Sequence, residues 1–360
     1  MNSEVIVSTL SILLTAATIA SLIKWDNWWI RVFDFPRLQI TTLIILNLGI
    51  SALAYDFVTR WDYVLVGLLL LSFIYQSYKI LPYTPFWKKQ VRRHKGNDHS
   101  RAISIMVSNV LTPNKKAQKL VERVKQVKPQ ILLTLETDQW WEDQLKDLEA
   151  DYPHRVQMPL DNLYGMHLYS KLELIEYEIK FLIQEDIPSI EALVKLPSGD
   201  AIRIYCLHPM PPSPTESDTS TNRDAEILLV GKTLTKQKEP VLVFGDLNDV
   251  AWSNTTRLFQ QISGLLDPRI GRGFFSTFHA KYPLFRWPLD HVFHSHHFEL
   301  ISYRRLKSIG SDHFPIFTKL YLQPHQTAKP EIPQADEEDK QEVTEKIEKG
   351  NPIREVVESA

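Results

Sequence analysis

Three uncharged, strongly apolar stretches near the amino terminus constrain this chain more than any other feature. They contain 19, 18 and 16 residues and are Val5–Ile23, Leu38–Tyr55 and Tyr63–Tyr78. A helix needs about 20 apolar residues to cross a bilayer, and the third stretch approaches that length because further apolar residues follow Lys79, whose charge can snorkel. Tryptophan and tyrosine residues crowd the ends, as at membrane interfaces. We expect a membrane domain at residues 1–82 with three transmembrane helices.

The basic residues predict how these helices are oriented. The loop after the first stretch has Lys24, Arg31 and Arg37, the next loop has only Arg60, and six Lys or Arg residues lie between positions 79 and 95. The positive-inside rule then places the amino terminus outside and everything after residue 82 in the cytoplasm. We therefore expect a multi-pass protein of the cell inner membrane with a basic juxtamembrane linker at 83–100. A cleaved signal peptide explains the first stretch less well, because no basic residue precedes it and two more stretches follow.

The carboxyl-terminal region, residues 323–360, has a different composition. It has few large apolar residues, several prolines and many charges. Such a segment buries too little apolar surface to offset the entropy of ordering it. We expect a mostly disordered, charged tail, with at most a transient helix at residues 336–349.

Residues 101–322 have the size and composition of one soluble domain. They carry 26 Lys and Arg against 27 Asp and Glu, so charge alone indicates no general attraction to nucleic acid. Ten apolar runs predict strands: Ile103–Val107, Ile131–Leu135, Met166–Tyr169, Leu174–Ile183, Ile190–Leu196, Ile202–Leu207, Val241–Phe244, Leu289–Phe293, Leu300–Tyr303 and Ile316–Leu322. Helical periodicity is present in Lys115–Val127 and Asp224–Thr235. Many strands and few helices favour an α/β fold with two packed sheets and helices outside.

Nearly every predicted core strand stops or starts at a carboxylate, an amide or an imidazole. The residues at these ends are Asn109, Glu136, His208, Asp246 with Asn248, Asp290, and Asp312 with His313. Each one alone is more simply explained as a helix cap or a turn, since Gly, Asp and Asn suit turns. Six such endings in one domain favour a site at a shared sheet edge.

These residue types fit one chemistry. The oxygen ligands of Glu136, Asn109 and Asp312 suit Mg²⁺ or Mn²⁺, and the lone Cys206 excludes a cysteine-based zinc site and a disulfide within the chain. His313 is a candidate general base with Asp290 fixing its tautomer. Asp246 and Asn248 could orient a water and a phosphate oxygen, and His208 could stabilise developing charge.

The motif series resembles the endonuclease/exonuclease/phosphatase superfamily, which includes deoxyribonuclease I and exonuclease III. It consists of N-V at 109–110, E at 136, H-P at 208–209, G-D-L-N at 245–248, L-D-H-V at 289–292 and G-S-D-H-F-P at 310–315. The resemblance implies a four-layer α/β sandwich over about residues 101–322 and Mg²⁺-dependent hydrolysis of phosphoesters. It implies that Glu136 is the principal metal ligand, helped by Asn109 and Asp312. It leaves open whether His313 or Asp246 takes the proton of the attacking water.

Differences between this sequence and the superfamily's motifs reduce the number of possible substrates. The sequence lacks the hallmark arginines of the inositol 5-phosphatases, which argues against inositol phosphates, and it is most similar to a bacterial group with membrane spans ahead of the domain. We expect a membrane-anchored phosphodiesterase, phosphatase or nuclease. The substrate stays open among nucleic acid, a phospholipid and a small phosphoester, and no feature indicates an obligate protein partner. The alternative is an inactive binding scaffold, but the full set of site residues is present.

Overall fold

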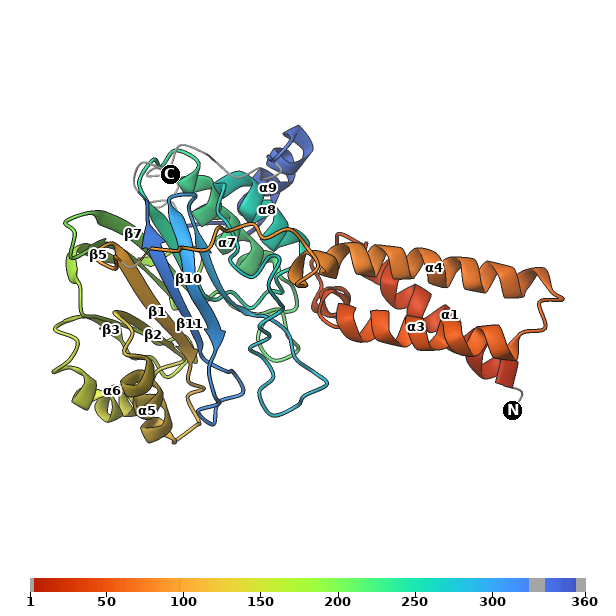
Figure 1. The fold of residues 1–360 in the computed structure, drawn as a ribbon, viewed down its shortest axis with the longest axis horizontal. Helices are drawn as coiled ribbons and strands as arrows, with labels where there is room; N and C mark the ends of the chain where they lie inside the picture. The colour runs from red at the N-terminus through yellow and green to blue at the C-terminus, as the bar shows by residue number, and fades with distance from the viewer. Residues whose placement is uncertain (1–2, 97, 324–333, 354–360) are drawn as a thin grey trace.

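The three apolar stretches form helices. In a computed structural model, which describes residues 3–96, 98–323 and 334–353, they are α1 (Ser3–Ala20), α3 (Arg37–Ala54) and α4 (Arg60–Ile80). Each is long and apolar enough to span a membrane, as predicted. The helices form a bundle that projects from an α/β domain, with the amino terminus at the bundle's far end (Figure 1). Short turns lie at the end next to the domain: α2 (Trp28–Arg31), η1 (Val32–Asp34) and η2 (Leu81–Tyr83).

The bundle buries hydrogen-bonded polar side chains beside a small apolar cluster and exposes large apolar side chains. The buried amide of Asn47 donates to the Ser11 hydroxyl at 2.7 Å, and the buried amide of Gln76 donates to the Thr18 hydroxyl at 3.1 Å. Large apolar side chains face outward instead, among them Ile12, Leu13, Leu46, Leu71 and Ile74. A helix in water buries its apolar stripe, whereas helices in lipid are held together by close packing and interhelical hydrogen bonds. The surface of this bundle therefore suits hydrocarbon.

The domain contains two mixed β-sheets. The first has the strand order β10-β11-β1-β2-β4-β3 and the second has the order β5-β6-β7-β8-β9. The strands of the first are β1 (Ala102–Asn109), β2 (Ile131–Leu135), β3 (His154–Met158), β4 (Met166–Ser170), β10 (Phe298–Arg305) and β11 (Ile316–Leu322). Those of the second are β5 (Glu173–Phe181), β6 (Pro188–Lys195), β7 (Ala201–Leu207), β8 (Val241–Asp246) and β9 (Asp290–His294). Each of the ten predicted apolar runs matches a strand to within two residues at its ends, and β3 was not predicted.

The two sheets pack face to face and helices cover their outer faces, which confirms the four-layer prediction (Figure 1). The core between the sheets includes Ile105 and Leu133 from the first sheet and Ile204 and Phe244 from the second. On the first sheet lie α5 (Ala117–Val127), α6 (Gln139–Gln144) and η3 (Lys146–Leu148). On the second lie α7 (Thr221–Leu234) and α8 (Asn254–Ser263). The central strands are apolar on both faces because each face is covered.

The prediction of a disordered tail is wrong for the part of it that the structure describes. Helix α9 (Glu337–Lys349) begins with a capping box between Asp336 and Asp339 and packs on α7 through Val343 and Ile347. The Lys346 ammonium also lies 2.9 Å from a buried carboxylate of α7, that of Asp224. The composition of this segment did not indicate a docked helix. Two apolar residues one helical turn apart and one buried ion pair hold it on α7. The predicted tail residues 324–333 and 354–360 lie outside the described residues.

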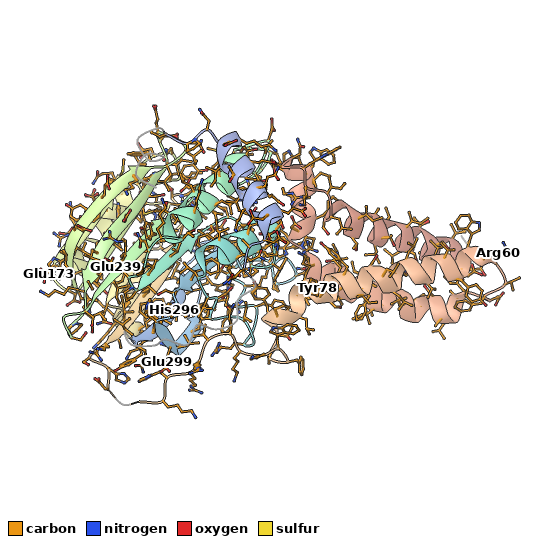
Figure 2. The ribbon with its side chains drawn as sticks, turned by 90° about the horizontal axis from the view of Figure 1, so that it is seen from above. Arg60, Tyr78, Glu173, Glu239, His296 and Glu299 are labelled. Atoms are coloured by element: carbon orange, nitrogen blue, oxygen red, sulfur yellow. The ribbon has the colours of Figure 1, made fainter. Side chains whose placement is uncertain are left out.

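The bundle and the domain are joined by more than the chain between them. The indole of Trp252 donates to the backbone oxygen of Asp34 at 2.7 Å, and the Tyr83 hydroxyl donates to that of Ala251 at 2.5 Å. One apolar cluster contains residues from both parts: Phe35, Ile80, Tyr83, Val250, Ala251, Trp252, Phe278, Trp287 and Leu289. In Figure 2, Arg60 marks the far end of α4, Tyr78 its end near the domain, and Glu173 the side of the domain away from the bundle.

Candidate active site

The topology brings the polar strand ends to one edge. β1 and β2 run parallel, and so do β7 and β8, so the carboxyl ends of each pair lie together. β11 pairs antiparallel with β1 and β9 antiparallel with β8, which places the amino ends of β9 and β11 beside them. Asp246 and Asp290 are direct cross-strand partners. The fold therefore collects the residues that the sequence analysis singled out.

Glu136, Asn109 and Asp246 form the first half of the site. The Asn109 amide donates to Glu136 Oε1 at 2.7 Å and to Asp246 Oδ2 at 3.1 Å, so one amide joins the two sheets. Burial raises the pKa of Glu136 to about 7, although the Asn109 hydrogen bond opposes the shift. Burial also raises the pKa of Asp246. One amide therefore contacts two carboxyl groups whose pKa values are raised by burial.

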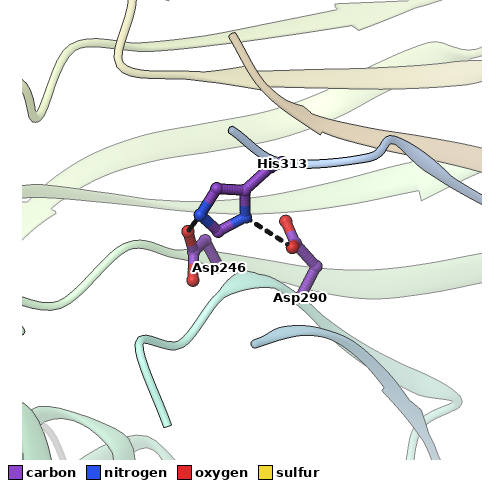
Figure 3. Close-up of side chains that lie close together, drawn as sticks. All are labelled: Asp246, Asp290 and His313. Atoms are coloured by element: carbon purple, nitrogen blue, oxygen red, sulfur yellow. Dashed lines mark hydrogen bonds and ion pairs between the residues drawn. The ribbon is translucent and has the colours of Figure 1, made fainter. Parts of the chain in front are cut away.

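His313 and its two carboxylates form the second half (Figure 3). The ring Nδ1 lies 2.8 Å from Asp290 Oδ2, and Nε2 lies 3.4 Å from Asp246 Oδ2. Burial lowers the pKa of His313, but the charges of Asp246 and Asp290 outweigh burial and raise the pKa to about 10. With both nitrogens facing carboxylates, the imidazolium is the cation that this group holds when no metal is bound.

A divalent cation fits the other half of the site. Glu136 Oε2 is buried and has no hydrogen-bond partner among the described residues. It belongs to a carboxyl whose pKa burial has raised, and such a group is stabilised when a cation replaces its proton. Carboxylate and amide oxygens are the ligands that hard cations prefer. Asp246, Asp290 and His313 also offer atoms within 4.8 Å of one another, so acidic groups lie on both sides of the Asn109 amide.

Asp312 lies less centrally than the other predicted metal ligands. Its carboxylate accepts from the Ser311 hydroxyl at 3.2 Å, and its backbone oxygen accepts from Ala280 at 2.6 Å. Its charge raises the pKa of both Glu136 and His313, although it is a minor cause of each shift. The structure therefore places Asp312 beside the site without a direct bond to Glu136.

His208 and Asn248 complete the predicted set. Burial lowers the pKa of His208 to about 4, so its ring is neutral at pH 7, and its Nδ1 has no partner among the described residues. Asn248 donates its side-chain amide to the backbone oxygen of Pro209 at 3.0 Å, and its backbone nitrogen donates to Asp246 Oδ1 at 3.0 Å. The contact with Pro209 ties the end of β8 to the end of β7, and the contact with Asp246 closes the turn after β8.

The backbone is strained at two of these positions. Glu136 has a φ of 59° and Asn248 a φ of 51°, in the left-handed region that costs energy for residues other than glycine. Gly245 is required for a different reason, since a Cβ there would lie 1.9 Å from the backbone oxygen of Leu207. These departures from ordinary strand geometry turn the side chains after β2 and β8 toward the shared edge.

Several residues of the site region could not be assigned from the sequence. Asp249, next to the G-D-L-N motif, is buried beside Arg223 at 3.4 Å and accepts from Thr256 at 3.1 Å, so it anchors the start of α8. Arg223 donates to the backbone oxygen of Asn248 at 2.9 Å. The Tyr164 ring lies 5.3 Å from that of His208. No local pattern in the sequence marks either Arg223 or Tyr164.

His291, in the L-D-H-V motif, has a structural place. Its Nδ1 accepts from the Arg269 guanidinium at 2.7 Å and its Nε2 lies 2.9 Å from the backbone oxygen of Asp249. Burial lowers the pKa of His291 well below its ordinary value, so the ring is neutral. It holds the segment after β8 against β9 and does not face the site.

Comparison with known proteins identifies the family. Residues 106–313 match the model of the Endonuclease/Exonuclease/phosphatase family, which covers more than half of the chain. The chain belongs to this family. The matched range contains every predicted site residue from Asn109 in the order given above. No curated protein matches the chain in a sequence search.

Solved structures share the fold of this family. The catalytic domain of human Nocturnin with bound sulfate aligns with a TM-score of 0.50 at 16% identity, covering 62% of this chain and 96% of that one. An endonuclease/exonuclease/phosphatase from Beutenbergia cavernae aligns with a TM-score of 0.49 at 14% identity, covering 62% and 72%. D. rerio TDP2 with a single-strand DNA product aligns with a TM-score of 0.47 at 17% identity, covering 61% and 98%. At such identities the likeness to Nocturnin shows the fold alone.

Proposed function

We propose that this protein is a membrane-anchored, divalent-metal-dependent hydrolase of phosphoester bonds. One observation carries the proposal: the unpartnered, buried Glu136 Oε2 lies in the same site as the Asp246–His313–Asp290 chain, and the Asn109 amide connects the two halves. A cation position beside a proton-transfer pair is what hydrolysis of a phosphoester requires. The inactive scaffold is less well supported, because a binding role does not require a buried carboxylate chain.

The proposed roles follow from these contacts. Glu136 and Asn109 would hold the metal with help from Asp312, and Mg²⁺ is the expected ion, with Mn²⁺ as the substitute. When bound, the metal supplies positive charge to the phosphate and lowers the pKa of the attacking water. The proton of that water passes to the Asp246–His313 pair, whose atoms lie 3.4 Å apart. Asp290 holds His313 in orientation, Asn248 positions the phosphate, and the neutral His208 donates to its developing charge.

The bundle supports the membrane part of the proposal. Its outward surface is apolar and its buried polar groups bond to one another. Most of the basic residues near the bundle lie in two segments, the loop between α1 and α3 and the segment after α4. Both segments lie at the end of the bundle next to the domain (Figure 1). The positive-inside rule therefore favours a domain on the cytoplasmic face of the inner membrane.

Replacement of Glu136 by glutamine tests the proposed metal site. The full chain in detergent should hydrolyse bis-p-nitrophenyl phosphate with Mg²⁺ or Mn²⁺ and stop when EDTA is added. Glu136→Gln keeps the shape and removes the charge, so turnover should fall by about 10²-fold or more, the scale of a lost electrostatic group. Because burial raises the pKa of Glu136 to about 7, the folded protein should be at least as stable to heat. Turnover of the variant at the wild-type rate would refute the metal assignment.

A further inference from the structure

A loop beside the site, residues 279–287, exposes large apolar side chains. Its sequence is HAKYPLFRW. Tyr282 is 58% exposed, Leu284 is 76% exposed and Phe285 is 57% exposed. Single apolar residues on a surface are ordinary, but a cluster of three within four positions marks an interaction surface.

The loop lies at the level where the bundle would enter the bilayer. The side-chain amide of Gln39 donates to the backbone oxygen of Leu284 at 2.7 Å, and Gln39 is in the first turn of α3. The loop hangs from the side of the domain that faces the bundle (Figure 1). Phe86 and Trp87, just after α4, are exposed as well. Aromatic residues at this depth are typical of the membrane interface.

The other end of the loop reaches the active site. The Phe278 ring lies 5.0 Å from the His313 ring, and the Ala280 nitrogen donates to the backbone oxygen of Asp312 at 2.6 Å. Phe278 and Trp287, the residues around the loop, belong to the apolar cluster that also contains Ile80 at the end of α4. A short segment thus connects His313 and Asp312 of the site with the end of the bundle next to the domain.

Exposed basic residues accompany the apolar ones. Lys281 lies in the loop, and Lys88, Lys89, Arg92 and Arg93 follow the last membrane helix. The linker runs against the domain, since the Gly271 nitrogen donates to the backbone oxygen of Pro82 at 2.8 Å. Basic residues at the cytoplasmic surface are attracted to anionic headgroups. A segment that lies in the headgroup region of a membrane typically has exposed apolar side chains flanked by basic ones.

We propose that the substrate of this site is a phosphoester in the headgroup of a bilayer phospholipid, presented by the 279–287 loop. The inference rests on the proposed function. The loop inserts Tyr282, Leu284 and Phe285 among the headgroups and so brings a lipid phosphate to His313. Water adds its oxygen to the phosphorus, the ester P–O bond breaks, and the leaving oxygen takes up the proton. A nucleic acid is disfavoured, because affinity for nucleic acid comes largely from basic residues, of which the domain carries no excess.

The activity test compares two substrates on the same protein. The full chain is reconstituted into vesicles of phosphatidylethanolamine and phosphatidylglycerol, and phosphate-containing headgroup products are measured by mass spectrometry. Bis-p-nitrophenyl phosphate reports the chemical step without a bilayer. The double variant Leu284→Asp with Phe285→Asp should lower lipid turnover by 10-fold or more while bis-p-nitrophenyl phosphate turnover stays within twofold. The matched control, Ile175→Asp with Tyr177→Asp, changes two exposed apolar residues of β5, on the far side of the domain (Figure 2), and should leave both rates unchanged.

A second measurement reads loop position without catalysis. Cys206 is the one cysteine of the chain and is buried, so Leu284→Cys can be labelled with a fluorophore in the folded protein. Lipids with a nitroxide near the headgroup should quench the label at position 284 at least threefold more than a label at Ile175→Cys.

The outcomes separate the two proposals. Equal quenching at the two positions, or lipid turnover that survives the double aspartate change, overturns the role of the loop. Hydrolysis of DNA or RNA by a protein that leaves every vesicle lipid intact also overturns it, while the proposed function stands. No turnover of bis-p-nitrophenyl phosphate with any divalent metal refutes the proposed function itself, whatever the position of the loop.

Discussion

The contact between Asp290 and His313 gives the most direct test of the site's chemistry. Asp290 Oδ2 lies 2.8 Å from His313 Nδ1, and both side chains are buried. Asp290→Asn keeps the size of the side chain but removes one of the two charges that hold the imidazolium. The amide can also donate to Nδ1, which selects the tautomer with its proton on Nε2, facing Asp246. The ring is then neutral and no longer pairs the Asp246 carboxylate with a positive charge.

The expected loss is large and specific to turnover. General acid–base groups contribute about 10²–10⁴-fold to a rate, and an orienting carboxylate that sets a histidine tautomer lies near the upper end of that range. We expect kcat for bis-p-nitrophenyl phosphate to fall by about 10³-fold, which corresponds to about 4 kcal/mol of transition-state stabilisation. KM should change little, because Asp290 acts through His313.

The matched control is a buried aspartate that does not contact His313, although its partner Arg269 donates to the backbone oxygen of Asp290 at 3.3 Å. Asp267 lies 2.8 Å from the Arg269 guanidinium, and both are buried in the same part of the domain. Asp267→Asn leaves that cation without its partner, which costs about 3–5 kcal/mol of folding free energy, but the remaining folded molecules should turn over at the normal rate. Equal losses of rate in the two variants, or an Asp290→Asn rate within threefold of wild type, would refute the assigned role.

Two further predictions concern stability and topology. Burial raises the pKa of Glu226 on α7 to about 7, where it accepts from the Ser189 hydroxyl at 2.9 Å. The folded state therefore prefers the protonated acid, and stability is lost as pH rises from about 4.5 through 7; Glu226→Gln should stabilise the protein by about 3 kcal/mol at pH 8 and by almost nothing at pH 4 in unfolding experiments. A flat difference between the two pH values would contradict this. For topology, alkaline phosphatase fusions in a bacterial host should be inactive after residues 26 and 82 and active after residue 57; an active fusion after residue 82 would invert the predicted orientation.

The architecture could be predicted because its signals are local. Every apolar run that was taken as a strand is one, since central strands covered on both faces are continuously apolar. The edge strand β3 (His154–Met158) was missed because its apolar residues alternate with polar ones and it is only partly buried. Helix α8 was missed because most of its residues are polar, and its start is fixed by the Ser253 cap and by Asp249 beneath it. Such elements depend on tertiary contacts that a short window does not contain.

The sequence predicted which residues gather in the site better than it predicted which of them contact one another. Parallel neighbours end at the same edge, so residues after β1 and β2, and after β7 and β8, were expected to gather. The contact of Asn109 with Asp246 crosses from one sheet to the other, and no spacing in the sequence specifies it. The same holds for Arg223, which reaches the backbone of Asn248 from α7. Contacts between the two sheets, or between a helix and a loop, depend on how the whole core packs. No local stretch of the sequence specifies them.

The last residue of β8 and the six residues after it form part of the site and also join it to the helices. Asp246 belongs to the site, Asp249 anchors α8, Ala251 accepts from Tyr83 beside α4, and Trp252 donates to the turn before α3. The site is therefore attached to the ends of the bundle helices by side-chain and backbone contacts of these residues as well as by the basic linker. A domain held only by a flexible linker could approach substrates at any height above the bilayer. With the bundle in a bilayer, as proposed, these contacts would hold the domain at one height and in one orientation, which favours a substrate whose phosphate lies at the membrane surface.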